Sequence, residues 1–182
     1  MPRLLVAAIV LVLLSIGFAH AKGEAAAHVY EYGIYKAPLG FEYGVSRHGI
    51  VQSHVDDIDL VEKTSTVIAQ MGGGFGIRYR LTGLPRGTVG LLTIVIKYPA
   101  PGILADGGSV PFTEDEYTEL VALSGNRFYT WSFDRRTDLV PGIWTFEVWV
   151  GGKKLCEQKF NVILPPIASR TSPALLGSAK VG

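Results

Sequence analysis

The sequence predicts an all-β fold, an antiparallel sandwich or barrel, and three observations support this prediction. Hydrophobic residues alternate with polar residues or glycine through most of the chain, which is the period of a strand with one buried face. Turns rich in Pro and Gly interrupt these runs at short, nearly regular intervals. Long stretches with the helical period are missing from the sequence.

The alternation begins weakly and then becomes strong. Residues 28–35 and 58–68 carry weak strand patterns. Gly72–Gly74 precede a strand rather than a helix, so we expect a bulge or tight turn there and no phosphate-binding loop. Residues 75–81 then place large hydrophobic side chains on one face and arginine or glycine on the other, which is the clearest strand of this half.

The middle of the chain holds a central strand and the single helical signal. Residues 89–98 are apolar on both faces, which is typical of a strand in the interior of a sheet. In PFTEDEYTEL, residues 111–120, Thr113 and Glu116 match a capping box. We therefore expect a turn or two of helix there, crossing between the sheets.

Three strands follow, and the last two form a hairpin. In residues 128–133 and again in residues 144–150, large hydrophobic side chains recur at every second position and so lie on one face of the strand. In the second segment this face includes Trp144 and is expected to face the core. Gly151-Gly152 then turns the chain into the last strand, residues 154–163.

The last strand has a break in its parity. Leu155 and Phe160 are both apolar but of opposite parity, so a regular strand cannot bury both on one face. We expect a bulge between them, around Cys156 to Gln158.

The first residues predict export. MPRLLVAAIVLVLLSIGFAHA has a basic residue, an apolar run and a small-x-small end, the pattern of a secretory signal peptide over residues 1–21. Cleavage is expected between Ala21 and Lys22. An uncleaved anchor is the alternative, but the apolar run is shorter than the roughly 20 residues of a membrane span. We expect a periplasmic or secreted protein without membrane insertion after cleavage.

The rest of the chain divides into three parts. A short N-terminal lead, residues 22–26, precedes one sandwich domain at residues 27–164. Two prolines follow Leu164, and the small polar residues after them have no periodicity. We therefore expect a flexible C-terminal tail at residues 165–182.

Charge and cysteine content exclude some functions. The formal net charge is +1, and removing Arg3 with the leader leaves 16 basic and 16 acidic residues. This balance argues against nucleic-acid binding, which normally needs a basic excess. The single cysteine cannot form an internal disulfide, so the domain must be stabilised by burial and hydrogen bonding alone. No cofactor is expected.

Cys156 is the first candidate for chemistry. A nucleophilic cysteine needs a nearby base and a lowered pKa, and no motif of cysteine enzymes surrounds this residue. By parity it shares a face with Phe160 and Val162. We interpret it as a small core residue.

The polar stretch from Ser46 to Asp59 is the second candidate. Ser46 and His48 suggest a hydrolase, but the Gly-x-Ser-x-Gly elbow is missing. His54 and Asp56 suggest a cation site, but the acidic residues lack the spacing of a calcium loop. We expect a solvated strand edge here, with no metal ligand and no catalytic residue.

Trp149, Arg78 and Arg80 form the candidate surface patch for ligand binding. Trp149 has the parity of Glu147, opposite to the core-facing side chains of its strand. An outward Trp can mark a binding surface, but we favour cover by the N-terminal segment or by residues 111–120. The two arginines point outward together and are expected to pair with strand carboxylates such as Glu147.

Several of these segments together resemble a known bacterial family. FGIRYRLTGLP, the YPAPG turn, the YTWSFD strand and the closing hairpin are similar to the family called domain of unknown function 3859. The resemblance covers most of residues 27–164. It implies an immunoglobulin-like antiparallel β-sandwich of about seven to eight strands with at most one short helical turn. It brings no catalytic residues, and a fold alone does not define a function.

The expected function is non-catalytic binding or accessory work in the bacterial cell envelope, with a protein or glycan as partner. Paired sheets offer edge strands and end loops for such recognition. Two alternatives stay open. One is an envelope enzyme with a site built from scattered polar residues such as His48, His54 and Asp56. The other is a structural spacer without a specific ligand.

Overall fold

A computed structural model describes residues 23–36, 41–54 and 57–166. Within these ranges the fold is all-β, with one short 3-10 turn at Arg136–Asp138. The strands are β1 (Ala26–Lys36), β2 (Phe41–Val45), β3 (Val51–His54), β4 (Asp59–Glu62), β5 (Thr66–Ile68), β6 (Gly74–Thr82), β7 (Val89–Lys97), β8 (Glu114–Ala122), β9 (Gly125–Ser132), β10 (Gly142–Val150) and β11 (Lys153–Ile163).

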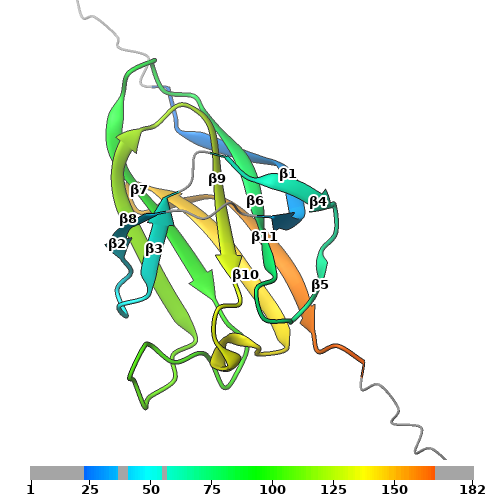
Figure 1. The fold of residues 1–182 in the computed structure, drawn as a ribbon. Coiled ribbons are helices and arrows are strands. Elements are labelled where there is room, and N and C mark those ends of the chain that lie inside the picture. Colours follow the sequence, from blue (N-terminus) through cyan, green and yellow to red (C-terminus); the bar gives the residue numbers. More distant parts are fainter. Residues whose placement is uncertain (1–22, 37–40, 55–56, 167–182) are drawn as a thin grey trace, which may run out of the picture.

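The strands form two packed sheets and a separate hairpin (Figure 1). One sheet has the order β4-β1-β6-β9, and the other has the order β5-β11-β10-β7-β8. Neighbouring strands are antiparallel except β5, which runs parallel to β11. The predicted β-sandwich is confirmed. The described strands outnumber the predicted seven to eight for two reasons. Residues 41–68, where we expected one strand, divide into four short ones, and β8 stands where a helical turn was expected.

The hairpin of β2 and β3 closes one side of the sandwich, between the edge strands β8 and β9. At its turn, the Arg47 N–H donates to the carbonyl of Glu116 in β8 at 2.8 Å. From the other sheet, the Tyr129 hydroxyl of β9 donates to Gln52 Oε1 at 3.4 Å. The hairpin therefore ties the edges of the two sheets together.

Aromatic side chains fill the space between the sheets, around Trp144 of β10. Phe75 of β6 and Phe146 of β10 stack with ring centroids 5.2 Å apart. Tyr98 packs edge-on against Trp144 at 4.8 Å. Such rings bury large apolar areas and prefer offset or edge-on contacts. This cluster joins the two sheets in place of a disulfide.

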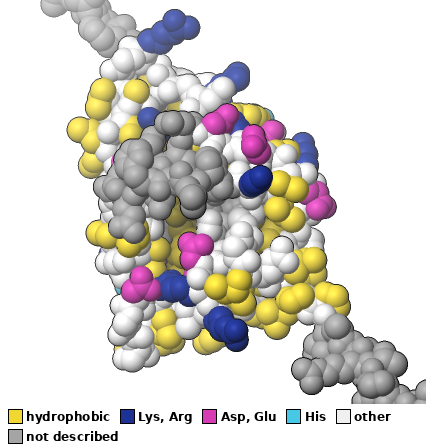
Figure 2. All heavy atoms as spheres, in the orientation of Figure 1, with side chains coloured by type: hydrophobic (Ala, Val, Ile, Leu, Met, Phe, Trp, Pro, Cys, Tyr) yellow, Lys and Arg dark blue, Asp and Glu magenta, His cyan; other side chains and the backbone are white. Residues whose placement is uncertain are grey.

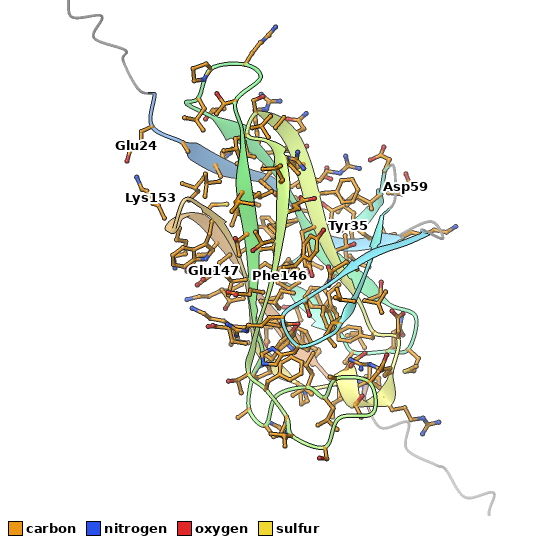
Figure 3. All side chains as sticks on the ribbon, turned by 90° about the vertical axis from the view of Figure 1, so that its left-hand side faces the viewer. Glu24, Tyr35, Asp59, Phe146, Glu147 and Lys153 are labelled. Carbon is orange, nitrogen blue, oxygen red and sulfur yellow. The ribbon has the colours of Figure 1, made fainter. Side chains whose placement is uncertain are left out.

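The predicted alternation of buried and outward side chains is confirmed in the long strands. Figure 3 shows Phe146 between the layers and its neighbour Glu147 on the other side of β10. In β6 the predicted inward face is fully buried, and Arg80 is exposed. The side chains with the least exposure are Trp144, Tyr79, Phe75, Phe133, Phe146, Phe160, Ile58, Ile77, Leu92, Ile103, Val148 and Val162.

The helical turn predicted at residues 111–120 is wrong. Strand β8 occupies most of this segment and pairs with β7 along its whole length. Thr113 and Glu116 match the local pattern of a capping box. A continuous ladder with β7 pairs every main-chain group on that side of the segment, and Tyr, Thr and Val suit a strand, so the tertiary pairing outweighs the local signal.

The closing hairpin is confirmed, with its bulge displaced by one residue. Gly151 and Gly152 both have positive φ, as a two-residue hairpin turn requires. Val148 lies opposite Cys156, but Trp149 lies opposite Lys154, so the extra residue is Leu155. The bulge therefore stands just before the predicted range.

The predicted leader at residues 1–21, with its cleavage site, and most of the predicted tail lie outside the described residues. Signal cleavage and tail flexibility therefore stay predictions. In the described part of the chain, no helix has the length and apolar character needed to cross a bilayer.

We expect Trp144→Ala to lower the free energy of unfolding by about 3–5 kcal/mol, because a large-to-small change leaves a cavity in a packed core. Urea denaturation followed by circular dichroism measures the loss. Trp149→Ala is the matched control, since it removes the same side chain from a half-exposed position of the same strand. Equal losses in the two variants would contradict the assignment of Trp144 to the centre of the core.

Candidate functional site

The three residues of the predicted surface patch do not lie together. Trp149 belongs to β10 and lies on the outer face of the five-stranded sheet. Arg78 and Arg80 belong to β6 and lie on the outer face of the four-stranded sheet. These faces point away from each other, so the patch is not one binding surface.

Arg78 is held by carboxylates on its own side of the sandwich. Its Nε lies 3.0 Å from Glu31 Oε1. Its Nη2 donates to Asp57 Oδ1 at 2.8 Å and also to the carbonyl of Ile58. Arg78 therefore pairs with one strand carboxylate, Glu31, as expected, and with Asp57 outside the strands. Glu147 is not a partner because it lies on the other sheet.

Trp149 is half-buried and is held by a side chain of its own strand. Its indole N–H donates to Glu147 Oε2 at 3.0 Å. Glu147 is buried, and its Oε1 lies 3.0 Å from Lys97 Nζ and 3.3 Å from Lys154 Nζ. Burial alone raises the pKa of Glu147, but the hydrogen bonds from Lys97, Trp149 and Lys154 outweigh burial, so the pKa is lowered. The expected cover by residues 111–120 is wrong, because they form a strand of the same sheet.

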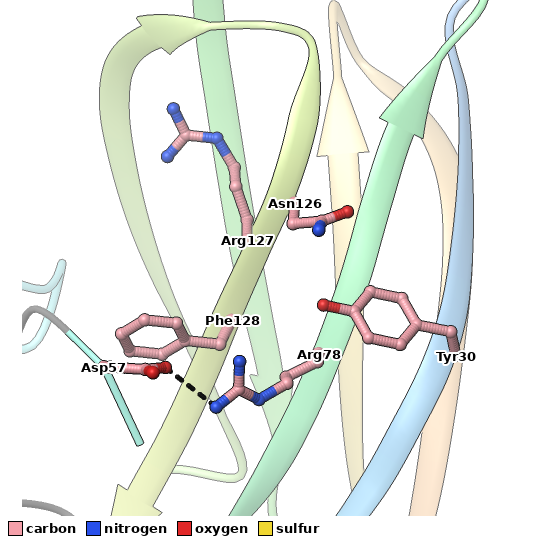
Figure 4. Close-up of a pocket in the computed structure, with 6 residues that line it drawn as sticks. All are labelled: Tyr30, Asp57, Arg78, Asn126, Arg127 and Phe128. Carbon is pink, nitrogen blue, oxygen red and sulfur yellow. Dashed lines mark hydrogen bonds and ion pairs between the residues drawn. The ribbon is translucent and has the colours of Figure 1, made fainter. Parts of the chain in front are cut away.

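A shallow pocket of about 200 Å³ lies on the outer face of the four-stranded sheet (Figure 4). It combines two aromatic rings with charged and amide side chains. The residues that line it are Tyr30, Asp57, Arg78, Asn126, Arg127 and Phe128.

Three neighbouring strands position the pocket residues. A bulge in β1 after Val29 adds Tyr30, which lies half-exposed at the pocket rim. In β6, Arg78 lies directly opposite Phe128 of β9. Because directly opposite residues share a face of the sheet, the guanidinium and the ring are neighbours.

The pocket offers both hydrogen-bond donors and acceptors. Arg80 Nε donates to Asn126 Oδ1 at 2.8 Å, which leaves the Asn126 amide nitrogen as a donor. The Tyr30 hydroxyl points into the pocket (Figure 4). The pKa of Asp57 is lowered by the hydrogen bond from the Ile58 N–H and by the adjacent guanidinium, so its carboxylate is an ionised acceptor at neutral pH.

The structure brings Ser46 and His48 together around Asp115, a residue that sequence reasoning missed. Ser46 Oγ donates to Asp115 Oδ2. Asp115 Oδ1 accepts the His48 N–H at 3.1 Å and lies 3.0 Å from His48 Nδ1. The Glu116 N–H donates to the same oxygen at 2.9 Å. Both oxygens of this buried carboxylate are therefore engaged.

This arrangement differs from a Ser-His-Asp triad. In a triad the imidazole takes the proton of the serine hydroxyl, whereas Ser46 bonds directly to the carboxylate. Ser46 Oγ also accepts the Ile50 N–H at 3.0 Å, and the His48 ring stacks on Phe112 with centroids 4.1 Å apart. These contacts hold the turn of the β2–β3 hairpin against β8.

The second half of the predicted polar stretch is only partly described. The side chain of His54 and all of Asp56 lie outside the described residues, so the expectation that they bind no cation stays a prediction. Within the described ranges, no three His, Cys, Asp or Glu side chains gather as a metal site would require.

Cys156 lies opposite Val148 and packs half-buried against the hydrophobic core. The parity predicted for it is confirmed. Burial raises the pKa of its thiol to about 11. Little thiolate therefore forms at neutral pH, and the residue lacks the lowered pKa of a nucleophilic cysteine.

The sequence matches the family model of the domain of unknown function DUF3859 over residues 24–162. The chain belongs to this family. No curated protein matches the sequence significantly.

A solved structure shares the fold of this DUF3859 domain, and a second gives a weaker match. An immunoglobulin-like protein from Pseudomonas aeruginosa matches with a TM-score of 0.55 and 23% identity, over 79% of this chain and 99% of that one. The alkylpurine DNA glycosylase of Pseudomonas fluorescens, bound to DNA containing an abasic site analogue, gives a TM-score of 0.37 and 13% identity, over 54% of this chain and 27% of that one. The first match shows the immunoglobulin-like fold, and the second is too distant to support an argument.

The pocket residues of β1 and β9 were also missed at the sequence level, whereas Asp57 lies in the predicted polar stretch. Tyr30 lies at the bulge in β1, where the alternation of hydrophobic and polar residues is interrupted. Asn126 lies at the start of β9, where the alternation has only begun. Asp115 could have been found from the sequence, because an acidic residue at an inward position of a strand needs buried hydrogen-bond donors and so points to a polar contact in the interior. The helical interpretation of residues 111–120 concealed it.

We expect Asp115→Ala to lower the free energy of unfolding of the DUF3859 domain by about 2–3 kcal/mol, because hydrogen bonds to a buried charged group are stronger than neutral ones. Urea denaturation measures the loss, and hydrogen exchange shows faster opening of β2 and β3. Thr118→Ala, at an exposed position farther along β8, is the matched control. A hairpin that exchanges as slowly in Asp115→Ala as in the control would show that Asp115 does not hold it.

We expect the Cys156 thiol to react with an aromatic disulfide reagent at least about tenfold more slowly in the native protein than in urea. The raised pKa and partial burial both reduce the supply of accessible thiolate, and unfolding returns the pKa to about 8.5. The absorbance of the released thiolate reports the rate. Similar native and unfolded rates would contradict the packing of Cys156 on the core.

Proposed function

We propose that this DUF3859 domain is an exported, non-catalytic binding module of the bacterial cell envelope, which holds one sugar unit of a glycan in the pocket of the four-stranded sheet. The observation that carries the proposal is the pocket itself, where hydrogen-bonding side chains lie beside two aromatic rings. Export rests on the signal peptide predicted at residues 1–21.

The size of the pocket supports one unit of a larger ligand. Its volume of about 200 Å³ is below the roughly 300–1,000 Å³ typical of sites that enclose a whole small molecule. An open pocket of this size contacts one unit and leaves the neighbouring units of a chain outside. A glycan meets this condition, since its units repeat along an extended chain.

The chemistry of the lining supports a sugar. Each sugar hydroxyl is both a donor and an acceptor, and the pocket offers the Asn126 amide and Tyr30 hydroxyl as donors next to the Asp57 carboxylate as acceptor. Sugar rings also have C–H faces, which pack against aromatic rings such as those of Tyr30 and Phe128.

The charge of the pocket favours a neutral sugar over an anion. Arg78 is already paired with Glu31 and Asp57. Arg127 Nη1 lies 3.4 Å from Glu119 Oε1. An anion would have to displace these carboxylates, whereas a hydroxyl can bond to a guanidinium and a carboxylate at the same time.

The contacts of the polar candidates support a non-catalytic role. Ser46 bonds to Asp115 rather than to an imidazole, and His48 is held by the same carboxylate. The thiol of Cys156 has a raised pKa. An envelope hydrolase activity that His48→Ala abolished in a folded protein would contradict this part of the proposal.

The binding test is an NMR titration of the isotope-labelled protein with N-acetylglucosamine oligomers and, separately, with glucose oligomers. We expect saturable shifts of the Asn126–Phe128 amides with one of these series. Tyr30→Ala and Asn126→Ala should each weaken that binding at least about tenfold, because each removes a contact of more than about 1.4 kcal/mol.

Ile143→Ala is the control, since Ile143 is an exposed residue of the other sheet and should leave the affinity unchanged. The proposal fails if neither series gives saturable shifts in β9, or if both pocket variants bind as tightly as the wild type. Shifts produced in the same pocket only by a protein would replace the glycan with a protein partner.

A further inference from the structure

A hydrophobic surface lies on the other sheet, where β7 and β8 run side by side. Leu120 is 70% exposed and lies directly opposite Leu91, which is 58% exposed. Val89 is 60% exposed and lies opposite Ala122 at the end of the same strands. Hydrophobic atoms show along the upper left margin of the molecule, where these strand ends lie (Figures 1 and 2). We call these four residues the β8 patch.

The patch borders an edge strand. β8 is the last strand of the five-stranded sheet. The residues that flank it, Thr113 and Leu123, bond toward the β7 side through their main chain. Since the direction alternates along a strand, the even-numbered residues of β8 turn their N–H and C=O groups away from β7.

The domain itself uses only the two ends of this edge. At one end the Arg47 N–H bonds to the carbonyl of Glu116. At the other end Arg127 Nη2 donates to the carbonyl of Ala122 at 3.2 Å. No described residue bonds to the outward main-chain groups of Thr118 or Leu120. This middle segment is therefore open for pairing.

The middle of β8 also lacks the features that protect edge strands. Natural sheets protect their edges by short strands, charged side chains or a covering segment. The edge strands β4 and β5 have only 4 and 3 residues. From Thr118 to Ala122 the single charged residue is Glu119, and Glu119 turns toward Arg127 of the other sheet.

We propose that this edge pairs with the same strand of a second copy of the chain, in an antiparallel two-fold dimer centred on Leu120. In this register Leu120 lies opposite Leu120 of the second copy, and Thr118 lies opposite Ala122. Glu119 lies opposite Val121, so no acidic residue of the paired segment opposes another. A two-fold interface needs such a self-complementary surface.

The β8 patch favours a second copy over a foreign strand as the occupant. In the two-fold register, the patches of both copies join across the new strand pair into one continuous apolar surface. Cross-strand contact between the two Leu120 side chains and their Leu91 neighbours adds packing to the main-chain bonds. A polar foreign strand would satisfy the edge and leave the patch exposed.

The dimer would also present two ligand sites on one side, a consequence that rests on the proposed glycan binding. A two-fold axis perpendicular to the joined sheet makes corresponding faces of both copies point the same way. The pocket lies on the outer face of the opposite sheet in each copy. Two pockets on one side allow avidity for a repeating ligand such as a glycan chain.

Sedimentation equilibrium of the full chain purified from the periplasm tests the dimer without any ligand. We expect a concentration-dependent dimer, and we expect Leu120→Lys to weaken it at least about tenfold, because like charges directly opposite repel. Val110→Lys is the matched control: Val110 is 77% exposed and lies outside the strand, so the dimer should persist. A monomer at every concentration, or a Leu120→Lys dimer of unchanged strength, would overturn the proposal.

Oxidative crosslinking tests the register. In a hydrogen-bonded pair the two Cα atoms lie about 5.5 Å apart, which suits a disulfide. Leu120→Cys should therefore form a crosslinked species of twice the chain mass, whereas Thr118→Cys, placed opposite Ala122, should not. Crosslinking of Leu120→Cys in the periplasm to a different protein would replace the second copy with a foreign strand. Neither result depends on glycan binding, so the two proposals can fail separately.

Discussion

The close packing of aromatic rings around Trp144 is the constraint on which the rest of the structure depends. With one cysteine in the chain, no internal disulfide can join the sheets. Rings from both sheets meet instead, as Phe75 of β6 and Phe146 of β10 do at 5.2 Å. Interiors packed at this density tolerate little change in shape. The packing decides which face of each strand turns inward, and thereby which side chains remain outside for recognition.

The buried carboxylates Asp115 and Glu147 serve the fold. Asp115 is buried, and its three contacts with Ser46 and His48 hold the β2–β3 hairpin. Glu147 is buried under Lys97 and Lys154 and also holds Trp149. A buried carboxylate needs such donors, because an unpaired one is costly. These engaged groups leave the outer faces as the surfaces for function: the pocket on one sheet and the β8 patch on the other.

The alternation of hydrophobic and polar residues predicted the fold well where one face of a strand is buried and the other faces solvent. Residues 75–81 and the closing hairpin meet this condition, and their inward faces are as predicted. Residues 111–120 do not meet this condition, because the β2–β3 hairpin covers the inner face of β8 and acidic residues lie on both of its faces. The alternation of hydrophobic and polar residues was therefore not visible in this segment, and the weak capping-box pattern led to the prediction of a helical turn. The short strands β2 and β3 left even less signal.

The sequence alone determined the all-β class, the two faces of the long strands, the inward direction of Trp144 and Cys156, and the family. These features follow from the period of two and from local turn chemistry, which act between near neighbours in the chain. The tertiary structure alone decided that Arg78 and Trp149 face opposite ways, that Asp115 joins Ser46 and His48, and that three strands share a pocket. Such contacts join residues far apart in the sequence, and their geometry depends on strand order and register, which local pattern does not specify.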